Sequence, residues 1–123
     1  MSEIRVKSVK LANGYTLEVF DMSRRISADA FLIKLRFAVE VPVTEEAVGS
    51  INISADEVKE TLKSDTCLFE VEVERNFIFE QDADALKEEL MDSYLKTNET
   101  YLNHSGFGPG LIKRRLIETK RVW

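Results

Sequence analysis

The strongest constraint in this sequence is an alternation of apolar and polar side chains that extends through two long segments. In residues 31–43 every odd-numbered side chain is apolar, whereas Lys34 and Arg36 lie on the even-numbered phase. Residues 67–80 repeat the pattern, with Glu70, Glu72, Glu74 and Asn76 on the even-numbered phase and one interruption of the apolar phase at Arg75. A helix would scatter each set around its circumference, whereas a strand places alternate side chains on one side. Both segments are therefore predicted to be strands.

The two predicted strands are expected to lie side by side in one antiparallel sheet. Their inward-facing side chains would be Phe31, Ile33, Leu35, Phe37, Val39, Val41, Val43, Cys67, Phe69, Val71, Val73, Phe77 and Phe79. On the other side, Lys34 and Arg36 would face the acidic row of Glu70, Glu72 and Glu74, at roughly 0.2 to 1 kcal/mol per opposite-charge pair. Burying one large apolar side chain contributes about 1.5 to 3 kcal/mol, so the apolar face is expected to set the register.

Shorter signals predict the remaining elements. Residues 4–11 and 15–20 are predicted to form a hairpin, because Asn13-Gly14 between them tolerates positive φ angles. Ser54 and Glu57 have the spacing of a capping box, which predicts a short helix over residues 55–63.

Two further helices are predicted in the last third of the chain. The first, over residues 82–103, would be apolar around half of its circumference. Residues 106–110 are expected to end it, because glycine favours a left-handed exit and proline blocks continuation. A final helix over residues 111–121 would turn inward the side chains of Leu111, Ile112, Leu116 and Val122. Together the elements predict a single α+β domain over residues 1–123, an antiparallel four-stranded sheet with long strands and helices packed on one face.

Composition excludes several classes of protein. The chain is 44% hydrophobic and 32% charged, which is too apolar for a disordered protein. The first residues alternate apolar and charged side chains, and no run of about 18 apolar residues occurs, so we expect a cytoplasmic protein without a membrane segment. Cys67 is the only cysteine, which excludes an internal disulfide and gives too few thiols for a zinc site.

Charge is distributed unevenly along the chain. The net charge is −5, but the last thirteen residues hold five cations against Glu118 alone, a local charge of +4 that leaves −9 elsewhere. Most of the surface would repel phosphate, so nucleic acid is not expected as a general partner. The candidate anion-binding residues are Lys113, Arg114, Arg115, Lys120 and Arg121.

The residues that could carry chemistry have simpler structural interpretations. His104, the sole histidine, falls at a predicted helix end, where a capping or solvated role is expected, and Ser105 beside it has no identifiable base or orienting group. Cys67 is expected to be an inert buried thiol. Residues 106–110 lack the third glycine of a dinucleotide fingerprint and would follow a helix instead of a strand. We therefore predict no catalytic residue, no metal site and no cofactor.

Parts of the strand region resemble the SecB-type export chaperones. The similar segments are residues 16–22, 31–43, 67–73 and 76–79, within a region that covers about half of the chain. The resemblance implies a four-stranded antiparallel sheet followed by helices, assembly into dimers or tetramers, and capture of unfolded polypeptide on apolar grooves.

Three functional hypotheses follow from the sequence. The first is a non-enzymatic homo-oligomeric domain that binds protein or peptide through apolar surface, because strands of ~14 residues far exceed the usual 5 to 6 and expose a large apolar area. The second is a small regulator that contacts nucleic acid or another anion through the basic C-terminal helix. The third is an enzyme in which carboxylates converge with His104 in a pocket.

Overall fold

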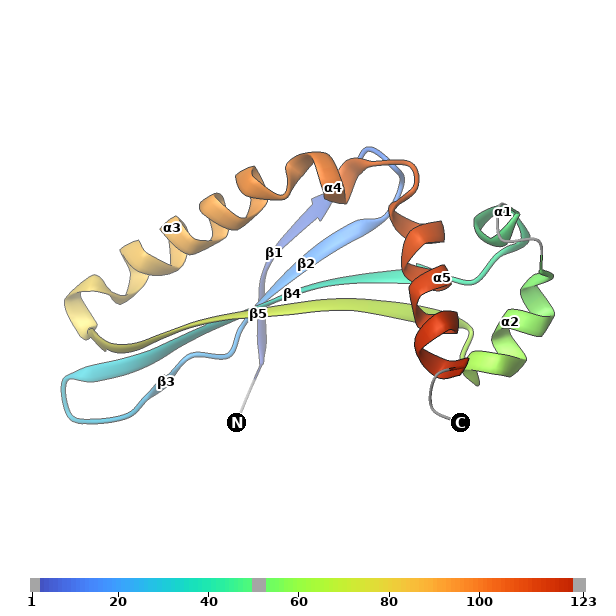
Figure 1. Ribbon diagram of the computed structural model, residues 1–123. Helices are drawn as coiled ribbons and strands as arrows, with labels where there is room; N and C mark the ends of the chain where they lie inside the picture. Colours follow the sequence, from blue (N-terminus) through green and yellow to red (C-terminus); the bar gives the residue numbers. More distant parts are fainter. Residues whose placement is uncertain (1–2, 50–52, 121–123) are drawn as a thin grey trace.

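An open antiparallel sheet forms one layer of the molecule, and the long helix after its last strand runs along it (Figure 1). The computed structural model describes residues 3–49 and 53–120. The strands are β1 (Ile4–Lys10), β2 (Thr16–Asp21), β3 (Arg24–Arg25), β4 (Ala30–Pro42) and β5 (Thr66–Phe79). The central strand is β4, which pairs with β2 and β3 along one side and with β5 along the other. Among the described residues, β5 pairs with no other strand and β1 pairs only with β2.

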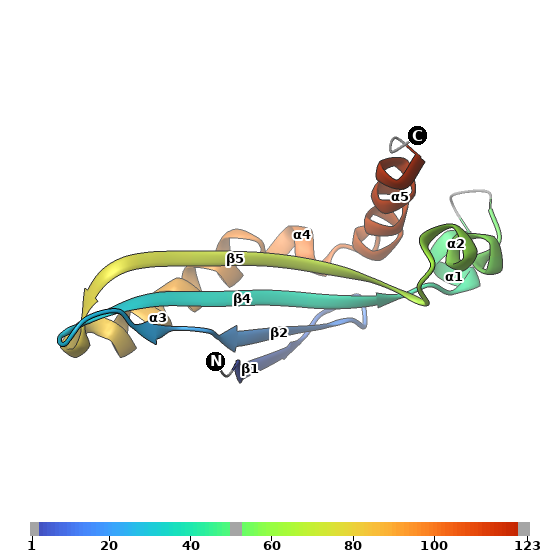
Figure 2. The ribbon, with the colours of Figure 1, turned by 90° about the horizontal axis from the view of Figure 1, so that it is seen from below.

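Five helices complete the described chain. They are α1 (Glu45–Val48), α2 (Ala55–Leu62), α3 (Glu80–Thr97), α4 (Glu99–Asn103) and α5 (Phe107–Lys120). α3 runs back along the sheet, and α5 crosses near the beginning of β5 (Figures 1 and 2). The capping box is present, because the Ser54 hydroxyl accepts the Glu57 N–H at 3.2 Å, and the predicted helix after it is confirmed as α2.

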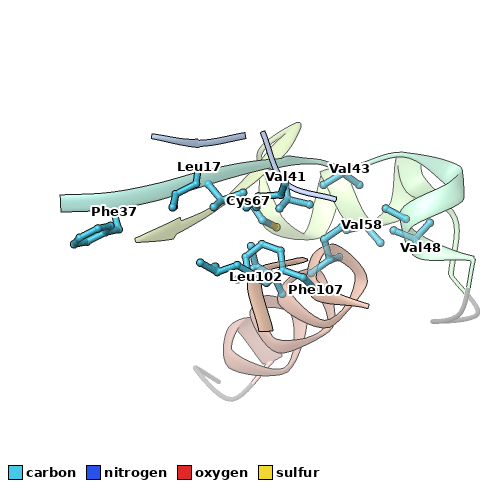
Figure 3. Packing of buried hydrophobic residues seen from close by; sticks show 14 of the residues in the cluster. Leu17, Phe37, Val41, Val43, Val48, Val58, Cys67, Leu102 and Phe107 are labelled. Carbon is cyan, nitrogen blue, oxygen red and sulfur yellow. The ribbon is translucent and has the colours of Figure 1, made fainter. Parts of the chain in front are cut away.

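Pairing of β4 with β5 confirms the central prediction. Leu35 lies opposite Val73 and Phe37 lies opposite Val71, so the odd-numbered side chains of both strands share one face. On β4 the odd-numbered residues from 33 to 41 are all 0% exposed. Figure 3 shows Phe37 and Val41 with Cys67 of β5 and, from the helical part, Leu102 and Phe107.

Two contacts attach α3 to this apolar face. The ring of Tyr94 stacks on Phe37 with centroids 4.0 Å apart, and burial raises the pKa of the Tyr94 hydroxyl. The Lys87 Nζ lies 2.9 Å from an Asp21 carboxylate oxygen, which joins α3 to the end of β2. An aromatic stack and a partly buried ion pair thus fix the helix across the sheet.

The opposite face carries the predicted charge ladder. Lys34 lies opposite Glu74 and Arg36 opposite Glu72. The ion pairs run diagonally, from Lys34 to Glu72 at 3.6 Å and from Arg36 to Glu70 at 2.7 Å. The prediction that Lys34 and Arg36 face the acidic row is therefore confirmed.

The strand count differs from the prediction because β3 is a separate short strand. At Ser23 the pairing between β2 and β4 is interrupted, since the Ser23 hydroxyl accepts the Lys34 N–H at 3.0 Å in place of a backbone carbonyl. The chain then pairs with β4 again through Arg24 and Arg25. The sheet therefore has five strands, where four were expected.

A β-bulge shifts the alternation of β5 by one residue beyond Arg75. Phe31 of β4 pairs with Ile78 and Ile33 pairs with Arg75, so between these pairs one residue of β4 corresponds to two of β5. Phe77 lies in the bulge with a φ of 55° and is 73% exposed, and Phe79 is 55% exposed. The prediction that Phe77 and Phe79 face the interior is wrong, because the bulge gives Ile78 the position opposite Phe31.

The predicted helix over residues 82–103 is interrupted at Asn98. The Asn98 side-chain amide donates to the Tyr94 carbonyl at 2.9 Å, the same carbonyl that the Asn98 backbone N–H uses. Asparagine competes in this way with helical hydrogen bonding, and the chain changes direction into α4. The first helix also begins two residues earlier than predicted, at Glu80.

The final helix begins at Phe107, four residues before the predicted start. Pro109 is tolerated because the N–H groups of the first turn have no partner within a helix, so its missing N–H costs nothing there. The first bond of this helix runs from the Gly110 N–H to the Gly106 carbonyl at 2.9 Å. The predicted inward residues Leu111, Ile112 and Leu116 are buried, and Val122 lies outside the described residues.

The loop of the N-terminal hairpin, which is confirmed, is tied to the end of α4. The Asn13 side-chain amide donates to the carbonyls of Leu102 at 2.7 Å and His104 at 3.0 Å. In return, Asn103 Oδ1 accepts the Ala12 N–H at 2.6 Å. These bonds satisfy carbonyls that the end of a helix leaves without partners.

We expect Gly108→Ala and Gly110→Ala to have opposite effects on stability. A Cβ atom at residue 108 would overlap the Tyr15 hydroxyl and lie 2.6 Å from its ring, whereas one at residue 110 meets nothing within 4 Å. Overpacking should cost Gly108→Ala about 1 to 3 kcal/mol, and Gly110→Ala should gain up to about 1 kcal/mol of helix propensity. Urea unfolding measures both, and equal effects would contradict this packing.

We expect Asp21→Asn to destabilise the protein at pH 7 by about 1 kcal/mol. Burial alone would raise the pKa of Asp21, but hydrogen bonds from Ser23 and Lys87 outweigh it and the pKa lies below its usual 3.8. The ionised carboxylate therefore stabilises the fold above pH 3.8, and this contribution disappears as the pH falls through the lowered pKa.

Urea unfolding at pH 7 and near pH 3 tests this expectation. Glu89→Gln removes one exposed carboxylate from α3 and serves as the control. A cost of Asp21→Asn that stayed the same at both pH values would show that the ion pair is not its origin.

Candidate functional site

The outer edge of β5 presents backbone groups that no described strand covers. On β4, Lys34 uses its carbonyl and its N–H toward Met22 and Ser23, on the β2 side. Alternate residues of a strand point their backbone groups to opposite sides, so the odd-numbered residues of β4 bond with the odd-numbered residues opposite them on β5. The even-numbered residues Glu70, Glu72 and Glu74 therefore direct their N–H and C=O groups outward.

Two arginines close the ends of this edge. Arg115 of α5 donates to the Leu68 carbonyl at 2.6 Å, where α5 passes the strand (Figure 2). Arg75 donates to the Glu74 carbonyl at 2.6 Å, just before the bulge. Covering or twisting an edge strand in this way prevents uncontrolled pairing with other chains. The stretch between the two arginines remains accessible; we call residues 69–74 the open edge.

Apolar side chains on the helix side of the open edge are only half-buried. Phe69, Val71 and Val73 continue the apolar face of β4, but β5 is the outer strand and the helices cover it incompletely. Phe69 packs against Tyr101 of α4 and Phe107 of α5, with centroids 6.1 and 5.3 Å away. The Tyr101 side chain itself is 41% exposed. The open edge thus borders an apolar shelf, formed by Phe69, Val71, Val73 and Tyr101.

Acidic side chains line the other side of the open edge. Glu70 and Glu72 share their charge with Arg36 and Lys34, and Arg36 also forms an ion pair with Glu3. Within residues 3–49 and 53–120, no ion pair involves Glu74. In this row Glu70 and Glu72 are therefore partly neutralised, and Glu74 is the carboxylate whose charge stays unpaired within the described residues.

A hollow of about 400 Å³ lies where α5 meets β5. Its lining includes Leu62, Cys67, Leu68, Glu70 and Arg115. The Cys67 thiol is 4% exposed, and burial raises its pKa, against a smaller lowering effect of Arg115. A thiol with a raised pKa is a poor nucleophile and a poor metal ligand.

The described basic side chains of the last helix, Lys113, Arg114 and Arg115, point in different directions. Lys113 and Arg114 are exposed, and Arg114 reaches the Tyr101 hydroxyl only at 3.5 Å. Arg115 is engaged with the Leu68 carbonyl and with Glu118. Successive residues of a helix point about 100° apart, so these three side chains spread around α5. Lys120 ends α5, and Arg121 lies outside the described residues.

His104 and Ser105 line different hollows. His104 Nδ1 accepts the Gly106 N–H at 2.9 Å, so the ring caps a turn, and no carboxylate lines the hollow of about 200 Å³ beside it. Ser105 lines a separate hollow with Tyr15, Glu46 and Pro109. The two side chains therefore do not form a nucleophile and base pair.

Two negative findings concern the described residues only. Residues 3–49 and 53–120 contain no group of three or more His, Cys, Asp or Glu side chains arranged to hold a metal ion. In the same ranges, every helix is too short or too polar to cross a membrane.

The sequence pattern predicts the strands of this site but does not predict that β5 lies at an exposed edge of the sheet. Alternation is the same on β4 and β5, so it shows which side chains share a face but not which strand lies at the edge. The charge of the even-numbered row was a usable signal, because edge strands often carry charged side chains on their exposed face.

In comparison with known proteins, no protein-family model, no curated protein and no solved structure matches this chain. The resemblance to SecB-type chaperones therefore stays a prediction.

We expect the Cys67 thiol to react with a disulfide reagent at pH 8 at least about ten-fold more slowly in the folded protein than in urea, because a buried thiol reacts only when the structure opens. The raised pKa further reduces the thiolate fraction at this pH. Absorbance of the released thiol measures the rate, and equal rates in both states would contradict the burial of Cys67.

Proposed function

We propose that the domain binds an extended apolar segment of another polypeptide along the open edge. The observation that carries this proposal is the contrast between two neighbouring strands with the same pattern. The odd-numbered residues 33–41 of β4 are 0% exposed, whereas Phe69, Val71 and Val73 of β5 are only half-buried. A bound segment would complete their burial.

Energy and shape both favour an extended ligand. Removing apolar surface from water contributes about 25 cal/mol per Å², so covering several half-buried side chains drives association. The shelf follows a strand, with a rise of about 3.3 Å per residue, and an extended segment can place alternate side chains along it. Tyr101 adds an aromatic contact of the kind that is enriched where proteins bind one another.

The proposal agrees with the first hypothesis from the sequence. Capture of unfolded polypeptide is also what the resemblance to SecB-type chaperones implies, and we include such capture in the proposal. Assembly of the chain into a homo-oligomer stays a prediction. Binding through apolar surface requires no catalytic group, metal or cofactor.

We expect Tyr101→Ala to weaken binding of an unfolded polypeptide by about five-fold or more, because truncating a central aromatic contact commonly costs over 1 kcal/mol. Fluorescence anisotropy with a labelled, permanently unfolded protein measures the affinity.

The control for this variant is Ile4→Ala. Ile4 is 59% exposed and lies on β1, which is at the other edge of the sheet from β5. Its truncation therefore removes exposed apolar surface far from the apolar shelf. Circular dichroism and urea unfolding verify that both variants fold. Absence of binding by the unaltered protein, or equal weakening by both variants, would contradict the proposed site.

A further inference from the structure

We propose that the bound segment joins the sheet as an additional strand beside β5, and that basic residues alternate with apolar residues in it. This inference rests on the proposed function and specifies how the ligand is held and which sequences are preferred. Apolar contact alone would not require a particular backbone arrangement in the ligand. The unpaired backbone groups of the open edge require a ligand backbone that is extended and pairs with β5.

The backbone groups at the open edge point in the direction that strand addition requires. Glu70 and Glu72 point their N–H and C=O groups outward, and no described strand or cap uses them. Strand addition would satisfy these groups with a partner backbone, as in other proteins that bind peptides at a sheet edge. The flanking carbonyls of Leu68 and Glu74 already accept bonds from Arg115 and Arg75. Pairing is therefore confined to the six residues of the open edge, a stretch of roughly 20 Å.

The side chains of β5 specify the chemistry of the partner. In an antiparallel pair, residues directly opposite each other lie on the same face of the sheet. Residues opposite Glu70, Glu72 and Glu74 would meet carboxylates, and Lys or Arg suits those positions. Residues opposite Val71 and Val73 would lie on the apolar shelf, and aliphatic or aromatic side chains suit those positions.

A second copy of this chain fits the edge poorly. A two-fold axis perpendicular to the sheet would place β5 antiparallel to its copy with the same faces on the same side. Even-numbered residues would then oppose even-numbered residues, and in the register that pairs residues 70–74 with their copies Glu70 would face Glu74 and Glu72 would face itself. Like charges directly opposite each other destabilise strand pairing. A basic and apolar segment of another protein is therefore the favoured occupant.

The first test uses two seven-residue peptides, one in which valine alternates with lysine and one in which valine alternates with glutamate. Isothermal titration calorimetry should show binding of the lysine peptide and at least about ten-fold weaker binding of the glutamate peptide, since each opposite-charge pair contributes roughly 1.4- to 5-fold and like charges reverse the sign. Equal affinity for both peptides would overturn the predicted preference.

Protein variants test whether the carboxylates of β5 cause the preference for the lysine peptide. Glu72→Gln/Glu74→Gln should weaken the lysine peptide by roughly 2- to 25-fold for the two neutralised carboxylates together. The matched control is Glu88→Gln/Glu89→Gln, which removes the same charge from exposed positions of α3. An equal loss in both variants would assign the preference to general charge and overturn the inference.

Backbone methylation of the lysine peptide tests strand addition directly. In antiparallel addition the lysine N–H groups bond to β5 and the valine N–H groups point away, so N-methyl-lysine should abolish binding and N-methyl-valine should preserve it. Addition in the parallel direction would reverse the two results and still support strand pairing. An equal effect at both positions would overturn it.

The outcomes also separate this inference from the proposed function. If the unfolded polypeptide binds in a Tyr101-dependent manner but the lysine peptide does not bind, strand addition fails and the proposed function stands. If neither binds, both fail. Light scattering tests whether a second copy of the chain occupies the open edge. If the protein is a dimer and the lysine peptide dissociates it, the open edge is the dimer interface and the inference is overturned.

Discussion

The pairing of β4 with β5 is the interaction on which the rest of the structure depends. It aligns the odd-numbered side chains of two long strands on one face, and this face gives α3 its Tyr94 contact and the end of the chain its aromatic cluster. The charge ladder on the other face follows from the same register. Several large side chains must be buried together, so a slip by one residue would expose all of them at once.

Much of this arrangement could be predicted from the sequence because period two is a direct consequence of strand geometry. The hairpin, both long strands, the charge ladder and α2 were predicted for that kind of local reason. The bulge was not, although Arg75 marks the place where the alternation first fails. The break at Asn98 and the early start of α5 depend on single hydrogen bonds that a polarity pattern does not contain.

The candidate site was harder to predict than the fold because it depends on an absence of neighbours. β4 and β5 have the same alternating pattern, yet β4 is the central strand and β5 is an edge strand. The order of strands in a sheet depends on the whole chain, so the pattern of one strand does not predict it. Guanidinium caps at Leu68 and Glu74, the bulge and a row of carboxylates all limit what can pair with β5. The same devices that protect an edge against aggregation also make it selective.

The hydrogen bonds between the hairpin loop and the end of α4 have a consequence for the order of folding. Asn13 and Leu102 are 89 positions apart, and Ala12 and Asn103 are 91 apart. Closing so large a loop has an entropic cost that only many simultaneous contacts can offset, and such topologies fold slowly. The hairpin loop is therefore among the last parts of the fold to be locked in place, and until then β1 is held only by its pairing with β2.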